Sequence, residues 1–195
     1  MGGHSAQWPW RTRALTLIAL ITGAAGWPGW GSAADNESAT LEHRVKAAFL
    51  YKIAGYVEWP HSSFAQPDTP ITIGVVGAEP VAAELSRIST GRTAQNRPIT
   101  VRQLKSNELP AGVHILFVGR AESGQLNQLV PKAQQRSILI VTESEGALAQ
   151  GSAINFVMAD GRVRFEVSLG SAEKSKLKLS SRLLAVAQEV FTRAP

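Results

Sequence analysis

The sequence has no cysteine among its 195 residues. Disulfide bonds are therefore excluded, and so are a thiol that senses oxidants and the attachment site of a lipoprotein. A chain of this length buries enough apolar surface to fold without disulfide bonds. The fold is therefore expected to depend on an ordinary hydrophobic core.

Charged residues are also few, and residues of one sign do not cluster along the sequence. Charged residues make up 18% of the sequence, and its lysines and arginines are scattered along the chain. The formal net charge of +5 therefore gives no support for a nucleic-acid-binding surface, and nucleic acid is not expected as a partner. Apolar residues make up 44%, a proportion typical of a globular domain.

Common catalytic and metal-binding patterns are missing. Beyond the first 34 residues the histidines are His43, His61 and His114, which are far apart in the sequence and do not predict a metal site. Gly74-x-x-Gly77 is not a dinucleotide-binding fingerprint, no Walker pattern follows a predicted strand, and no Gly-x-Ser-x-Gly turn is present. No cofactor, metal or catalytic residue is therefore predicted.

The start of the chain has the pattern of a signal peptide. Arg11 and Arg13 precede an apolar stretch at 14–25, and small residues at 31–34 suit cleavage after Ala33 or Ala34. An uncleaved membrane anchor is the alternative, but crossing a bilayer needs about 20 apolar residues. We expect residues 1–34 to be a cleaved signal peptide and residues 35–195 to form one domain in the periplasm.

Helical and strand-like patterns alternate beyond this leader. Residues 35–40 are polar and are expected to be a flexible start, with Thr40 capping the next helix. That helix is predicted over 41–57, with Val45, Phe49 and Ile53 on its apolar stripe and Lys46 off it. The remaining predicted strands are 71–76, 99–104, 113–118 and 138–141, and the remaining helices of this part are 81–88 and 122–135.

The most specific local prediction is a β-hairpin near the end of the chain. Segments 153–158 and 162–168 alternate in hydrophobicity around Asp160-Gly161, a favoured two-residue turn. The turn predicts five opposed pairs. Ile154 with Val167, Phe156 with Phe165 and Met158 with Val163 share the buried face, and Asn155 with Glu166 and Val157 with Arg164 share the other face. A final helix is predicted from Ser180 to Phe191.

Together these elements predict an α/β layered sandwich with a mixed, mainly parallel sheet, an antiparallel C-terminal hairpin and flanking helices. Ligands of such sheets bind outside the carboxyl ends of the parallel strands. We therefore treat five polar residues at those ends and on the hairpin as candidate contacts with a partner or ligand: Arg120, Glu143, Asn155, Arg164 and Glu166. The glycines at these ends are interpreted as turn formers, and His114 as a hydrogen-bonded structural residue.

A second group of candidates lies at the exit of the first helix. Tyr51, Tyr56, Glu58 and Trp59 are close in sequence. Two interpretations of Trp59 remain open: it plugs one end of the core, or it forms with the other three residues the aromatic rim of a pocket or interface.

Several segments carry a resemblance to a known family. Val45-Lys-Ala-Ala-Phe-Leu-Tyr51 with Tyr56-Val-Glu-Trp-Pro60 resembles the YfiR family of exported bacterial proteins. Three further segments match it in the same order: Ile71-Thr-Ile-Gly-Val-Val-Gly77, Ile154-Asn-Phe156 through Arg164-Phe-Glu-Val167, and Leu179-Ser-Ser-Arg-Leu-Leu-Ala185.

The resemblance implies a small α/β periplasmic protein, often dimeric, without a known catalytic activity. Characterised relatives restrain an inner-membrane diguanylate cyclase by binding its periplasmic sensor part, and an OmpA-like outer-membrane lipoprotein can sequester them. Some relatives contain cysteine and this sequence does not, so the resemblance does not imply redox control for this protein.

Three hypotheses follow. The first is a regulatory binding protein that restrains a membrane diguanylate cyclase through the Tyr51–Trp59 end and the hairpin, lowers cyclic-di-GMP signalling, and forms a homodimer as some relatives do. The second is a periplasmic small-molecule-binding sensor module. The third and least supported is a hydrolase that uses strand-end carboxylates or Ser144.

Overall fold

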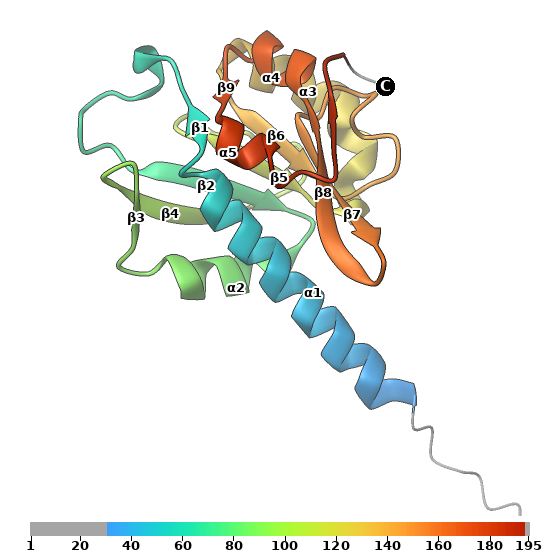
Figure 1. Cartoon of the computed structure of the whole chain (residues 1–195). Helices are drawn as coiled ribbons and strands as arrows, with labels where there is room; N and C mark the ends of the chain where they lie inside the picture. The colour runs from blue at the N-terminus through green and yellow to red at the C-terminus, as the bar shows by residue number, and fades with distance from the viewer. Residues whose placement is uncertain (1–30, 194–195) are drawn as a thin grey trace, which may run out of the picture.

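The computed structural model describes residues 31–193, so residues 1–30, which hold most of the predicted signal peptide, and residues 194–195 lie outside it. The described chain is an α/β sandwich, as the sequence predicts (Figure 1). None of its helices is long and apolar enough to cross a membrane.

An eight-stranded sheet forms the middle layer of the described residues, in the order β10-β8-β7-β6-β5-β2-β4-β3. It is mainly parallel, and its antiparallel pairs are β7–β8 and β3–β4. Its strands are β2 (Ile71–Val76), β3 (Thr93–Ala94), β4 (Arg97–Leu104), β5 (Ile115–Val118), β6 (Leu139–Thr142), β7 (Ile154–Ala159), β8 (Arg162–Ser168) and β10 (Glu189–Phe191). A separate antiparallel pair joins β1 (Val57–Glu58) and β9 (Lys178–Leu179). The helices are α1 (Gly31–Ile53), α2 (Glu79–Ser89), α3 (Leu126–Gln135), α4 (Leu169–Lys174) and α5 (Ser181–Leu184), with 3-10 turns at His61–Ser63 and Arg120–Gln125.

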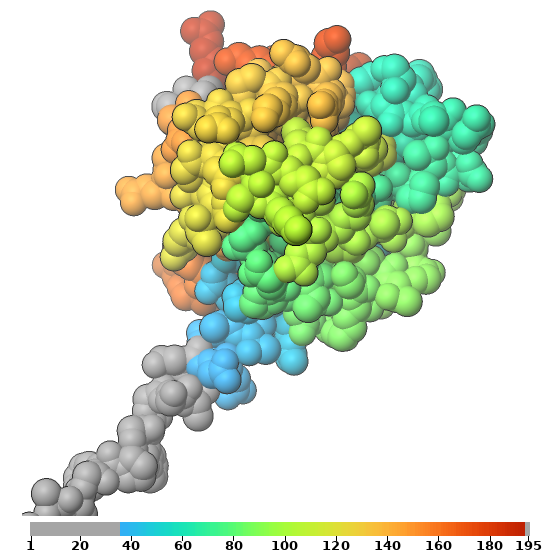
Figure 2. Space-filling view, turned by 180° about the vertical axis from the view of Figure 1, so that it is seen from behind, coloured from blue at the N-terminus to red at the C-terminus, as the bar shows by residue number. Residues whose placement is uncertain are grey.

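Different helices cover the two faces of the sheet, because successive side chains of a strand point to opposite faces. On β5, Ile115 and Phe117 join the core under α1 and α2, whereas Leu116 and Val118 join the core under α3. Both faces are buried, which explains why these strands read as continuous apolar runs. Figure 2 shows the molecule from behind, with the yellow region that includes α3 at the surface.

The β7–β8 hairpin has the predicted register. Phe156 pairs with Phe165, and the other four predicted pairs are also present. Asp160 and Gly161 have φ of 51° and 68°, the positive values that a two-residue hairpin turn of this type requires. Met158 is the exception to the predicted burial, because it lies next to the turn and is 54% exposed.

The limits predicted for the first helix are wrong at both ends. Residues 35–40 belong to α1, and Thr40 is no N-cap, since its hydroxyl donates to the carbonyl of Asn36 one turn earlier. The helix ends at Ile53, and Val57 then pairs with Leu179 as part of β1. The buried face also differs from the predicted stripe: Lys46 is buried, whereas Val45 and Phe49 are only partly buried.

The predicted C-terminal helix is also wrong over most of its length. Ser180 caps a helix as expected, because its hydroxyl accepts from the Leu183 amide at 3.4 Å, but α5 ends at Leu184. Glu189–Phe191 form β10, which pairs in parallel with β8. Earlier in the chain, the helix predicted from Glu122 begins as a 3-10 turn and becomes α-helical only at Leu126.

Candidate functional site

The parallel strands β2, β5 and β6 end at one edge of the sheet, here called the carboxyl edge. The turns after β2 and β5 touch there: a β-carbon on Gly119 would lie 2.1 Å from the carbonyl oxygen of Gly77, so only glycine fits. The amide of Arg120 then donates to Oε1 of Glu143 at 3.0 Å. This hydrogen bond connects Arg120 and Glu143, two predicted site residues that lie in different loops.

Lys46 reaches the same edge from α1. Its side chain is buried, with 4% of the residue exposed, and its Nζ forms ion pairs with Glu143 and with Glu42 one helical turn earlier. We call Glu42, Lys46 and Glu143 the ion cluster. A buried charge is stable only when it is paired, so Lys46 and Glu143 depend on each other.

Asn155 orders the loop that carries Glu143. Its Oδ1 lies 2.8 Å from the hydroxyl of Thr142 and accepts from the amide of Ser144 at 3.1 Å. Asn155 is 4% exposed, so this amide has a structural role as well as a place in the site. The hydroxyl of Ser144 is buried and, among the described residues, has no hydrogen-bond partner. No base therefore activates it, and this arrangement does not support a serine nucleophile.

A hollow of about 450 Å³ opens over these groups, and we call it the strand-end hollow. It brings together four of the predicted residues, Arg120, Glu143, Asn155 and Glu166. Burial raises the pKa of Glu166, and repulsion from Glu189 on β10 raises it further. The lining carries more carboxylates than cationic groups, since Glu42, Glu145 and Lys46 also contribute to it.

The second predicted group lies at the opposite edge of the sheet. The indole Nε1 of Trp59 donates to the carbonyl of His114, directly before the start of β5, at 3.3 Å. Trp59 is partly buried, and its ring meets the rings of Phe64 and His114 edge to face. This geometry favours the interpretation of Trp59 as a plug at one end of the core. Tyr51, Tyr56 and Glu58 lie on the same side of the fold: Tyr51 is in the last turn of α1, Tyr56 in the turn that follows it, and Glu58 in β1.

His114 is a hydrogen-bonded core residue, as predicted. Its Nδ1 accepts from the amide of Thr72 at 3.1 Å, and its Nε2 lies 3.1 Å from the carbonyl of Ser63. These partners fit a neutral ring that is protonated on Nε2. Burial lowers the pKa of His114 accordingly.

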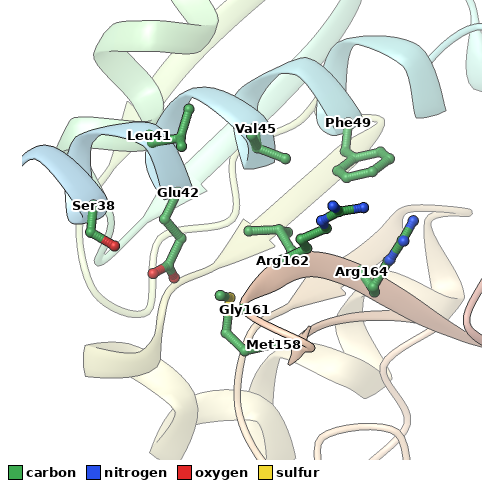
Figure 3. Close-up of a pocket in the computed structure, with 10 residues that line it drawn as sticks. Ser38, Leu41, Glu42, Val45, Phe49, Met158, Gly161, Arg162 and Arg164 are labelled. Carbon is green, nitrogen blue, oxygen red and sulfur yellow. The ribbon is translucent and has the colours of Figure 1, made fainter.

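Arg164 lies in neither of these places. It lines a groove between α1 and the β7–β8 hairpin, which we call the helix–hairpin groove (Figure 3). Its lining shares Glu42 and Met158 with that of the strand-end hollow.

The ion cluster is the feature that sequence reasoning missed. The apolar stripe predicted for this helix excludes Lys46, and Glu143 is 97 residues away from it in the chain. The only local signal is the spacing of four residues between Glu42 and Lys46, which is typical of an ion pair on a helix.

A comparison with protein families adds to this geometry. A family model described as YfiR/HmsC-like matches residues 43–188, most of the chain. The chain belongs to the YfiR/HmsC-like family. This family is a regulatory one, and it points to the control of cyclic-di-GMP signalling.

The family match includes the carboxyl edge of the sheet, the opposite edge with Trp59, and the hairpin, but it begins at His43. Lys46, Glu143 and Asn155 therefore lie within the segment shared with YfiR/HmsC-like proteins, whereas the outer turns of α1 lie before it. The first twelve residues of α1 are thus a part of this chain for which the family gives no expectation.

Proposed function

We propose that this protein is a periplasmic regulatory binding protein that restrains an inner-membrane diguanylate cyclase, or a similar membrane sensor, by protein–protein contact. The observation that carries the proposal is the YfiR/HmsC-like match over residues 43–188. The basic and apolar pattern of residues 1–34 supports export through a cleaved signal peptide. By this contact the protein lowers cyclic-di-GMP signalling.

The arrangement of the carboxyl edge supports binding more than chemistry. Lys46 and Glu143 neutralise each other, and the hydroxyl of Ser144 has no base within the described chain. Residues 31–193 also hold no group of three or more side chains placed to bind a metal ion. The ion cluster instead fixes α1 against the sheet, and a fixed surface loses little freedom when a partner binds it.

Restraint of a cyclase requires preferential binding to its inactive form. To shift a two-state sensor from about 1% inactive to about 99% inactive, the protein must bind the inactive form roughly 10⁴-fold more tightly than the active form. This preference corresponds to about 5.5 kcal/mol. A stable protein–protein interface of standard size buries about 800 Å² on each partner. The contact must therefore extend well beyond any single hollow.

Deletion of the gene tests this function. We expect the cyclic-di-GMP level to rise in the deletion strain and to return to normal when the full chain is supplied. A chain that lacks residues 2–34 is the matched control for location and should not restore the level. An unchanged cyclic-di-GMP level under biofilm-forming conditions would contradict the proposal.

Two further partners belong to the same proposal. An OmpA-like outer-membrane lipoprotein is expected to sequester the protein, and a second copy of the chain is expected as a homodimer. Co-purification after cross-linking checks the lipoprotein, and analytical ultracentrifugation checks the dimer. If the purified chain stays monomeric at high micromolar concentration, the proposed homodimer is contradicted.

A small-molecule-binding module is the second candidate, supported by the strand-end hollow. Its volume of about 450 Å³ lies within the range of ligand pockets. Trp59 is at the opposite edge of the sheet, so its fluorescence is a poor reporter of this hollow. A Met158→Trp variant places an indole at the hollow, and a metabolite screen that leaves both its emission and its melting temperature unchanged would count against this candidate.

A further inference from the structure

The helix–hairpin groove has two apolar walls. One wall carries Leu41, Val45 and Phe49, which recur every fourth residue along one side of α1 (Figure 3). The other wall carries Met158 and Val163 of the hairpin. The space between them is about 290 Å³, enough for a few anchoring side chains but not for a folded element. An occupant must therefore lie across the groove and insert side chains into it.

Exposed apolar side chains stand at the open end of this groove. Leu41 on α1 is 61% exposed and Met158 on the hairpin is 54% exposed, so each wall contributes one exposed apolar side chain to the lining. A single exposed leucine is ordinary, but large apolar side chains on both walls of one groove are typical of a binding surface. The start of α1 also extends past the body of the domain, as Figures 1 and 2 show from opposite sides.

The groove is basic. Arg162 and Arg164 are exposed on β8 and extend toward α1. Within residues 31–193 neither guanidinium group forms an ion pair, while the acidic residue of the lining, Glu42, is already paired with Lys46. Two positive charges beside an apolar floor are thus available to an incoming partner.

These charges argue against a second copy of the chain as the occupant. A two-fold symmetric contact centred on the groove uses the same patch of both copies, so it would gather two copies each of Arg162 and Arg164 in one interface. Juxtaposed like charges at an interface cost several kcal/mol. The charge pattern instead fits a partner with acidic side chains.

The apolar ridge on α1 favours one mode of peptide binding over another. Near the turn of the hairpin the outer strand edges are unpaired within residues 31–193, because β7 pairs with β6 only at Ile154 and Asn155, and β8 pairs with β10 only at residues 166–168. An extended peptide added to one of these edges would bind through its backbone and would leave the ridge on α1 unused. The ridge of Leu41, Val45 and Phe49 is instead suited to packing against another helix, whose own side chains repeat every three or four residues.

We propose that the helix–hairpin groove binds an amphipathic helix of a partner protein, with apolar side chains inserted between α1 and the hairpin and acidic side chains paired with Arg162 and Arg164. This inference rests on the proposed function in one respect, that the protein acts by binding another protein. It adds the site of contact and the chemistry of the partner segment.

A binding experiment with a defined probe tests the groove directly. The probe is a synthetic 18-residue amphipathic helical peptide with a leucine face flanked by glutamates, and its control replaces every glutamate with lysine. We expect the purified chain to bind the glutamate peptide in fluorescence anisotropy and to bind it at least tenfold more weakly after Arg162→Glu with Arg164→Glu. The matched control exchanges two other exposed arginines, Arg102→Glu with Arg182→Glu, and should stay within twofold of the original affinity.

Several results would overturn the inference. Equal binding of the glutamate and lysine peptides would contradict a preference for acidic side chains. Equal binding of the glutamate peptide to both double variants would show that Arg162 and Arg164 do not contribute to the binding. Binding of anionic phospholipid vesicles in place of the peptide would point to a membrane surface. Loss of self-association in the Arg162→Glu, Arg164→Glu variant would point to a second copy. Circular dichroism and melting curves of each variant check that the fold is kept.

The same variants in cells separate this inference from the proposed function. In a deletion strain, the groove variant should leave cyclic-di-GMP high, whereas the Arg102→Glu, Arg182→Glu control should restore it. Normal restoration by the groove variant would reject the groove and leave the regulatory function standing. A deletion with no effect on cyclic-di-GMP would reject the regulatory function, and the peptide experiment would still decide whether the groove binds acidic helices.

Discussion

Replacing Lys46 by methionine should destabilise the protein strongly although the apolar stem of the side chain is kept. The substitution leaves Glu143, whose side chain is 12% exposed, without its cationic partner. Breaking a buried ion pair by removing one partner costs about 3–5 kcal/mol. Glu143 keeps its bond from the Arg120 amide, and Glu42 is 31% exposed and remains partly hydrated, so we expect a loss of about 3 kcal/mol, the lower end of that range.

Urea unfolding at neutral pH measures this loss. After the proposed cleavage Trp59 is the only tryptophan, and because it lies at the far edge of the sheet its fluorescence reports global unfolding rather than the substitution itself. For a domain of this size the melting temperature should fall by about 6–12 °C. Lys52→Met on the exposed side of the same helix is the matched control and should change stability by less than about 0.5 kcal/mol.

A double variant completes this experiment. Removing the charge of Glu143 as well, by Lys46→Met with Glu143→Leu, should recover most of the lost stability, because an apolar pair in place of a buried ion pair is often neutral. A Lys46→Met variant as stable as the original chain, or a double variant no better than the single one, would show that the ion cluster is hydrated in solution and would refute the reasoning.

Three further outcomes follow from the fold. Burial lowers the pKa of His114, so the unfolded chain binds more protons and stability should fall as the pH drops below about 6.5; His114→Gln should flatten this dependence in unfolding curves between pH 7 and 5. The pKa of Glu166 is raised by burial and by Glu189, so Glu166→Gln should raise the melting temperature at pH 7, and the gain should vanish as the pH falls below about 4.5, where the carboxyl is protonated in both states. Gly119→Ala brings a methyl group against the carbonyl of Gly77 and should cost about 1–3 kcal/mol or more in urea unfolding, and an unchanged midpoint would contradict the close approach of the two turns.

Much of the sheet could be predicted from the sequence because its signals are local. Asp160-Gly161 accepts the positive φ values of the hairpin turn, and alternating side chains then determine the register. The buried parallel strands stand out as short runs rich in β-branched residues. These features depend on neighbours within a few residues, which a single sequence displays.

Two of the errors come from contacts between distant segments. Leu183, Leu184 and Ala187 have helical spacing up to Phe191, but pairing with β8 makes residues 189–191 a strand. The burial of Lys46 depends on Glu143, and hydrophobic periodicity counts lysine as a surface residue. The polar start of α1 has no apolar stripe to show that it is helical. Four residues of the candidate site at the carboxyl edge were predicted because strand ends meet there, but the groove beside Arg164 was not.

The length of α1 has a mechanical consequence. After the proposed cleavage α1 keeps residues 35–53, which form a rod of about 28 Å at 1.5 Å per residue. Its buried residues all lie in the second half, from Lys46 onward. The ion cluster lies near the point where this burial begins. We therefore expect a force that bends the first turns of α1 away from the sheet to separate Lys46 from Glu143. Because Glu143 also accepts from the amide of Arg120, such a force would act on the loops that follow β5 and β6.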